Sequence, residues 1–275
     1  MEDLTIDVDG LRVRFLRSGS GPALVLVHGL LGYSFSWRHV VSALARNSTV
    51  YALDLPGAGF SQASSEMDCC MRACAERLLR FMDAVGIRDC DLLGTSHGGA
   101  VAMIAASIAP ERIRQLILVD PVNPWSPHGR LLSVLLSNRV VAPVFCKFVL
   151  RLDLLHDFYF RRMYGDTRRI RPGTLEGYMQ PLFRPEAFEY GLSILRSWNH
   201  DLKDLGSIFP RISHIRTLLV WGSLDTAVDP ASAEKLEARF QDCQLVMLEG
   251  VGHLPYEEVP EKFVNVVSGF LARED

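Results

Sequence analysis

The chain has 275 residues, of which 48% are hydrophobic and 22% are charged, the balance of an ordinary soluble globular protein. This length is enough for one large α/β domain or two small ones, and the composition argues against a disordered chain. The net charge of −3 gives no general positive field, so no nucleic-acid partner is expected.

The first predicted element is an antiparallel hairpin. Leu4–Val8 and Leu11–Phe15 alternate apolar and polar residues, and Asp9-Gly10 between them is a strong tight-turn signal. Residues 1–7 are acidic and contain neither a basic n-region nor an apolar h-region. We therefore expect no signal peptide and a cytoplasmic protein.

Continuous apolar runs then predict strands that are buried on both faces, as in a parallel sheet. The runs are Ala23–Val27, Thr49–Leu53, Asp91–Leu93 and Leu116–Val119. Between them, residues 71–85 repeat apolar side chains at spacings of three and four, and residues 100–106 are apolar all round. This alternation of strand and helix predicts a doubly wound, mostly parallel sheet.

The alternation breaks after Asp120. No convincing buried strand is found from Pro121 to Pro210, where helix-like blocks cover residues 130–150, 154–163 and 185–205. The longest apolar-looking stretch, residues 131–150, is interrupted by serines, an asparagine, an arginine and a lysine. It therefore predicts one or two amphipathic helices, and no integral membrane segment is expected.

The strand and helix pattern resumes near residue 211. Thr217–Trp221 and Gln244–Leu248 read as strands, Ala231–Phe240 reads as a helix, and a final helix carries Phe263, Val266, Val267 and Phe270 on one stripe. We therefore predict a core domain of residues 1–122 and 211–275, with residues 123–210 inserted as a helical cap, or lid.

The decisive motif is Gly94-Thr95-Ser96-His97-Gly98, which fits the G-x-S-x-G pattern between a buried strand and an apolar helix. The chain must turn sharply here, and the two glycines flank the turn where a side chain would collide with a neighbouring element. The strained turn holds the Ser96 hydroxyl at the carboxyl edge of the sheet, where open parallel sheets bind ligands. Ser96 is therefore predicted to be a nucleophile.

With this turn in place, the chain resembles the α/β-hydrolase superfamily over nearly its whole length. The family orders its catalytic triad as serine, acid and histidine. Gly252-His253-Leu254-Pro255 follows the last predicted strand and resembles the family's histidine loop, which implies that His253 is the base. Trp221-Gly222-Ser223-Leu224-Asp225 resembles the acid turn and favours Asp225. Asp120 ends a strand where some relatives carry their acid, so it remains an alternative.

The resemblance also implies an oxyanion hole. His28-Gly29-Leu30 follows a buried strand and resembles the family's HG-x turn, so the backbone N–H groups of Leu30 and His97 are expected to bind the developing negative oxygen. Asp229 is expected to cap the helix that begins at Pro230. No cofactor or metal is expected, since the other histidines lack metal-ligand spacing and no cysteines form a CxxC pair.

These residues predict a serine hydrolase that cleaves a small, apolar carboxylic ester-like substrate through an acyl-enzyme on Ser96. Dehalogenases and epoxide hydrolases of this fold use aspartate at that position, so the serine argues against both. Carbon–carbon bond hydrolases of vinylogous diketone acids share the triad but usually carry asparagine where this chain has Thr95. They remain an alternative, as does a non-catalytic ligand-binding protein of the same fold. The sequence says nothing about oligomeric state.

Overall fold

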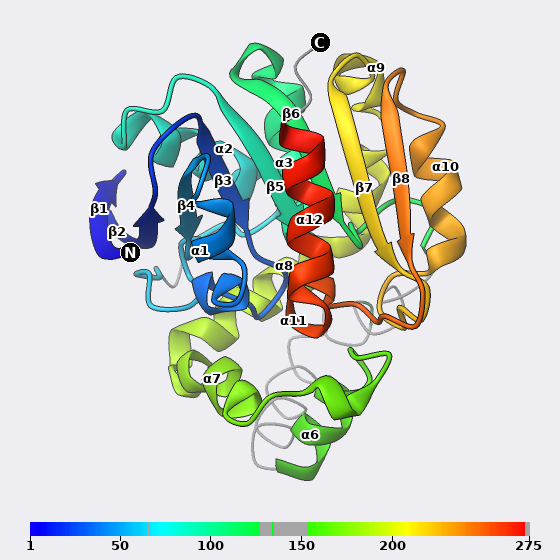
Figure 1. Cartoon of the computed structure of the whole chain (residues 1–275). Coiled ribbons are helices and arrows are strands. Elements are labelled where there is room, and N and C mark those ends of the chain that lie inside the picture. Colours follow the sequence, from blue (N-terminus) through cyan, green and yellow to red (C-terminus); the bar gives the residue numbers. More distant parts are fainter. Residues whose placement is uncertain (65–66, 127–133, 135–152, 273–275) are drawn as a thin grey trace.

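One eight-stranded sheet organises the chain (Figure 1). The computed structural model describes residues 1–64, 67–126, 134 and 153–272. The strands follow the order β1-β2-β4-β3-β5-β6-β7-β8 across the sheet. Because the strands at the centre of the sheet are covered by helices on both faces, the polar chemistry is confined to the strand ends.

The N-terminal hairpin is confirmed. Strands β1 (Glu2–Val8) and β2 (Leu11–Ser18) pair antiparallel. Asp9 and Gly10 both have positive φ, 54° and 79°, as the favoured two-residue turn between twisted strands requires. The hairpin joins the rest of the sheet through an antiparallel pairing of β2 with β4.

The remaining strands form the predicted parallel sheet. Their bounds are β3 (Ala23–Val27), β4 (Thr49–Leu53), β5 (Cys90–Thr95), β6 (Ile113–Val119), β7 (Arg216–Gly222) and β8 (Cys243–Leu248). All neighbouring pairs among them are parallel. β3 and β4 have the bounds that the apolar runs predict, and the other strands extend beyond theirs.

Two helical layers cover the sheet. On one face lie α2 (Met71–Ala84), α3 (His97–Ile108) and α10 (Ala233–Glu237). On the other face lie α1 (Val41–Leu44), α11 (Pro255–Glu258) and α12 (Pro260–Leu271). Short 3₁₀ turns are η1 (Ser34–Trp37), η2 (Pro110–Arg112) and η5 (Pro230–Ser232). Alternate residues of β3 belong to opposite cores: Val25 packs with the first layer and Leu26 with the second.

The described part of the insertion between β6 and β7 is helical. It contains α6 (Asp153–Arg161), η3 (Thr167–Arg169), α7 (Thr174–Met179), η4 (Gln180–Phe183), α8 (Pro185–Leu205) and α9 (Phe209–Ile212). α8 has the predicted bounds. The block predicted at residues 130–150 lies almost wholly outside the described residues. No helix in the described ranges is long and apolar enough to cross a membrane.

The second half of α8 is built into the core. Ile194 and Leu202 are buried in the same cluster as the side chains of α2 and α3. The Asp201 carboxylate accepts hydrogen bonds from the Met71 N–H at the start of α2 (3.0 Å) and from the Ser197 hydroxyl (2.7 Å). A helix of the insertion thus satisfies an N–H group that has no partner within α2 itself.

Candidate active site

Ser96 occupies a strained position between β5 and α3. Its φ of 53° and ψ of −122° lie in a region that non-glycine residues rarely adopt. Two hydrogen bonds, one to the end of β6 and one to the segment after it, hold it there. Its N–H donates to the Val119 carbonyl (2.9 Å), and its carbonyl accepts from the Val122 N–H (3.0 Å). Neighbouring structure therefore fixes the serine at the carboxyl edge of the sheet.

The two glycines that flank Ser96 are required by close backbone approach. A Cβ on Gly94 would overlap the Gly98 carbonyl oxygen, and a Cβ on Gly98 would overlap the carbonyl oxygens of Val27 and His28. Backbone atoms cannot move aside as a flexible side chain can. The collision predicted from the motif for a side chain at either position is therefore confirmed.

The predicted oxyanion turn lies against Ser96. A Cβ on Gly29 would be 3.1 Å from the Ser96 Cβ and 3.7 Å from its Oγ. α3 begins at His97, so its first N–H groups have no acceptor one turn earlier. We find no hydrogen bond from the Leu30 or His97 amide to any described residue. The positive end of α3 favours negative charge beside Ser96, and the two amides have no partner in the described ranges that would compete for it.

His28 orders this turn. Its Nε2 accepts a hydrogen bond from the Leu55 N–H (3.0 Å), so Nδ1 carries the proton and donates to the Gly29 carbonyl (2.8 Å). The ring is fully buried, and burial lowers its pKa. His28 is therefore a neutral structural residue that connects β3 to the loop after β4.

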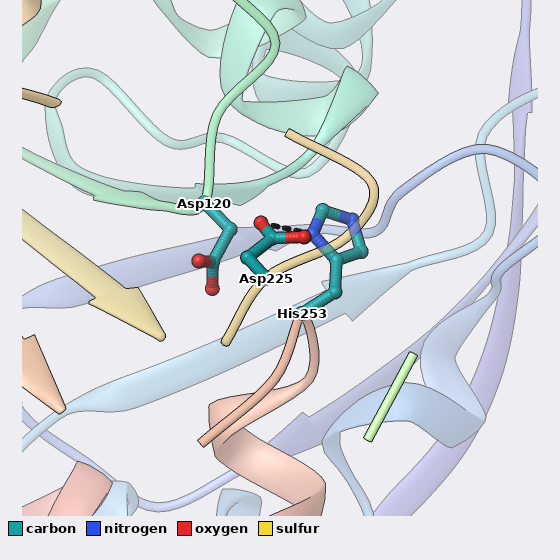
Figure 2. Close-up of side chains that lie close together, drawn as sticks. All are labelled: Asp120, Asp225 and His253. Atoms are coloured by element: carbon teal, nitrogen blue, oxygen red, sulfur yellow. Dashed lines mark hydrogen bonds and ion pairs between the residues drawn. The ribbon is translucent and has the colours of Figure 1, made fainter. Parts of the chain in front are cut away.

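The Asp225 and His253 side chains meet directly (Figure 2). The His253 Nδ1 is 2.7 Å from the Asp225 Oδ2, and the two side chains are 6% and 0% exposed. The Asp225 Oδ1 also accepts the N–H groups of Ala227 (2.6 Å) and Val228 (3.0 Å). An ionised carboxylate accepts from Nδ1–H, so the His253 Nε2 is left with a free lone pair.

Asp120 lies beside this pair at the end of β6. It is fully buried with a φ of 44°, and its Oδ1 accepts the Gly222 N–H (2.9 Å). Ligand atoms of Asp120, Asp225 and His253 lie within 4.8 Å of one another. In the described ranges the His253 ring donates a hydrogen bond to Asp225 and makes none with Asp120.

The same three side chains are the one group in the described ranges whose ligand atoms are close enough to hold a metal ion. The donor set of two carboxylates and an imidazole suits a divalent cation. A cation on Nδ1 would have to replace the Asp225 hydrogen bond to His253, however, so the observed geometry fits acid–base chemistry better than ligation.

Ser96 and His253 share the sheet edge without a direct bond. Ser96 is held by Val119, the residue before Asp120. Among the described residues, no hydrogen bond joins the Ser96 hydroxyl to the His253 ring. Such bonds often tighten only when substrate is bound. The structure thus joins two predicted triad residues directly. It holds the third at the end of β5, which β6 separates from β7.

Glu258 is a site residue that the sequence analysis missed. Its buried carboxylate accepts the N–H of Gly252 (2.5 Å), before His253, and those of Gly165 (2.9 Å) and Asp166 (3.1 Å) in the insertion. The His253 N–H itself donates to the Met163 carbonyl (2.7 Å). The histidine loop is therefore held by the insertion. Glu258 lies close to the predicted histidine loop in the sequence, but no spacing there identifies its partners in the insertion.

The side chains of two other polar residues singled out in the sequence, His97 and Asp229, make structural contacts. The His97 ring is buried against the Trp198 ring (centroids 6.2 Å apart), and burial lowers its pKa to about 3. It is therefore neutral, consistent with a role through its backbone N–H alone. Asp229 accepts the Ala231 N–H (2.9 Å) and so caps η5 as predicted.

Comparison with known proteins places these features in context. The family model described as the alpha/beta hydrolase fold matches residues 22–140. The chain is 31% identical over 262 aligned residues to the pimeloyl-[acyl-carrier protein] methyl ester esterase of Aeromonas hydrophila, covering 93% of this chain and 97% of that protein. It is 28% identical to the protein of that name from Nitrosospira multiformis, covering 90% and 94%.

Solved structures share the fold. The epoxide hydrolase CorEH superposes with a TM-score of 0.85 at 19% identity, covering 98% of both chains. A bacterial membrane phospholipase A superposes with a TM-score of 0.77 at 24% identity, covering 98% of this chain and 85% of that one. These two likenesses concern the architecture, since the identities are low.

Proposed function

Since this chain belongs to the α/β-hydrolase family, we propose that it is a serine hydrolase that cleaves small carboxylic esters through an acyl-enzyme on Ser96. Hydrolase activity follows from family membership and from esterase relatives near 30% identity. The observation that carries the proposal is the 2.7 Å hydrogen bond between His253 and Asp225 at the sheet edge that also bears Ser96. It leaves one imidazole nitrogen free to take the serine proton.

The first half of the reaction forms the acyl-enzyme. The His253 Nε2 accepts the hydroxyl proton as the Ser96 Oγ attacks the ester carbonyl carbon. The Leu30 and His97 amides stabilise the resulting oxyanion, and each such donor is typically worth roughly 100- to 1000-fold in rate. The intermediate then collapses, and the bond to the alcohol oxygen breaks as His253 returns its proton to that oxygen.

The second half releases the acid. Water gives a proton to His253 and attacks the acyl carbon, and the tetrahedral intermediate expels the Ser96 oxygen, which recovers its proton. Asp225 stays ionised throughout and stabilises the imidazolium, supported by its hydrogen bonds from Ala227 and Val228. No cofactor or metal takes part in either half.

The substrate is a small molecule with an apolar acyl group and an ester-like carbonyl. Residues 123–210 act as a lid over the sheet edge, and the core comprises residues 1–122 and 211–275. The hydrogen bonds of Glu258 to Gly165 and Asp166 support a lid that is attached to the histidine loop. Relatives named for a methyl ester make methyl and short-chain esters the first class to assay.

The deciding experiment measures hydrolysis of short-chain p-nitrophenyl esters by the wild type and by Ser96→Ala. We expect turnover that the variant loses. Weak ester turnover beside fast cleavage of a vinylogous diketone acid would instead identify a carbon–carbon bond hydrolase. No turnover of either substrate, with no labelling of Ser96 by a fluorophosphonate, would identify a ligand-binding protein.

A further inference from the structure

Two buried carboxyl groups lie side by side behind the His253 ring. Figure 2 shows the Asp120 and Asp225 side chains next to each other, with the ring on the far side of Asp225. Both residues are buried, with 0% and 6% of their surface exposed. Two carboxylates this close in a medium of low dielectric constant cannot both stay ionised, so one of them holds a proton.

The hydrogen-bond donors show which group is neutral. Asp225 accepts from the His253 ring and from the N–H groups of Ala227 and Val228, and three donors stabilise an anion. Asp120 accepts from the Gly222 N–H alone, through Oδ1. Its Oδ2 is buried with no other donor in the described ranges. Asp120 is therefore the group that the surroundings favour as the neutral acid.

We propose that Asp120 carries a proton on Oδ2 and donates it in a hydrogen bond to the Asp225 carboxylate. Asp120 is then a positioning residue, which acts on His253 only through Asp225. This inference rests on the proposed function, because it assigns a task to a neighbour of the triad. Burial and the adjacent charge of Asp225 raise the pKa of Asp120 well above its ordinary value, in agreement with this geometry.

The proton on Asp120 keeps the site at the charge that a general base needs. With Asp120 neutral, the ring faces one negative charge, and it can be unprotonated when substrate arrives. With Asp120 ionised, two negative charges would hold a proton on the ring and remove the base. The other acidic group that acts on Asp120 is Glu258, and the Tyr256 hydroxyl lies nearby. Both lie on α11, and Glu258 also disfavours a second anion here.

The test is an NMR titration of the His253 ring in the full chain, with the signal assigned by its loss in His253→Gln. In Asp120→Asn the side-chain amide keeps the shape and can donate to Asp225, and asparagine tolerates the positive φ. We expect the midpoint of the ring titration to stay where it is in the wild type. A fall of about one pH unit or more, the effect of removing a nearby charge, would overturn the proposal.

Asp120→Ala should shift the midpoint of the His253 titration in the direction opposite to the loss of a charge. Removing the donor concentrates negative charge on Asp225, so the ring should bind its proton more tightly and the midpoint should rise. An unchanged or lower midpoint would show that Asp120 does not donate to Asp225. If the alanine variant fails to fold, Asp120→Asn still decides the charge. The titration can be measured without turnover. A chain without esterase activity would therefore refute the proposed function, and the titration would still decide whether Asp120 is neutral.

Discussion

Replacing Glu258 by glutamine tests whether one buried carboxylate holds the insertion and the histidine loop together. The carboxylate Oε1 accepts from Gly252 and Gly165, and Oε2 accepts from Asp166 and from the Arg169 guanidinium (3.1 Å). Glutamine keeps one acceptor oxygen and turns an NH₂ group toward the other pair of donors. In the better orientation the Asp166 N–H loses its partner, while Arg169 keeps the hydrogen bond that it already donates to the Gly250 carbonyl (2.9 Å).

The stability lost in Glu258→Gln follows from the hydrogen bonds that the substitution removes. One unsatisfied buried N–H costs about 1–3 kcal/mol, and the loss of the charged partner of Arg169 adds about 1 kcal/mol more. We therefore expect Glu258→Gln to reduce the free energy of unfolding by about 2–4 kcal/mol, which lowers Tm by about 5 °C or more in a chain of this size. Because Gly252 precedes His253, ester turnover should also fall, by roughly tenfold to a hundredfold.

The assay is thermal unfolding followed by circular dichroism, with p-nitrophenyl ester hydrolysis on the same samples. Glu261→Gln is the matched control, since Glu261 is exposed in the first turn of α12. The control should unfold and react as the wild type does. If Glu258→Gln were as stable and as active as the control, the buried carboxylate would not be holding the two segments together.

Three further predictions follow from other contacts. Gly98→Ala should reduce the free energy of unfolding by about 1–3 kcal/mol or more, because the new Cβ overlaps backbone oxygens. A fully active variant with the wild-type Tm would show that the turn has room for a side chain. Because the pKa of Asp120 is raised in the folded state, the unfolded chain gives up this proton first as the pH rises above about 4. The free energy of unfolding of the wild type should therefore fall relative to that of Asp120→Asn by about 1.4 kcal/mol per pH unit, until Asp120 ionises in the folded state. Denaturation curves with a constant difference between the two proteins from pH 4 to 7 would refute this prediction. Asp225→Asn should lower kcat by about 10⁴-fold, whereas a comparable loss in Asp120→Asn with an active Asp225→Asn would make Asp120 the acid.

The parts of the fold that are set by local chemistry could be predicted from the sequence. Asp9-Gly10 supplies the positive φ values of the hairpin turn. Ala23–Val27 and Thr49–Leu53 are apolar runs whose ends coincide with β3 and β4 because both faces of those strands are buried. The nucleophile turn was visible because its glycines are required by backbone contact within one short segment.

The contacts that lie between distant segments could not be predicted. Glu258 meets Gly165 across 93 residues, and nothing in either segment identifies its partner. Asp201 caps α2 from the insertion, 130 residues beyond Met71. The predicted helix Ala231–Phe240 is divided into η5 and the shorter α10, since the Asp229 cap tightens its first turn. Such hydrogen bonds depend on the folded arrangement, which periodicity does not encode.

The most direct test of Ser96 as the nucleophile is mass spectrometry of the intact chain after reaction with a fluorophosphonate, followed by peptide mapping. We expect one adduct, on the hydroxyl of Ser96, formed quickly in the wild type and slowly in His253→Ala. An adduct on another residue, or equal rates in the two proteins, would contradict the claim that the imidazole of His253 activates Ser96.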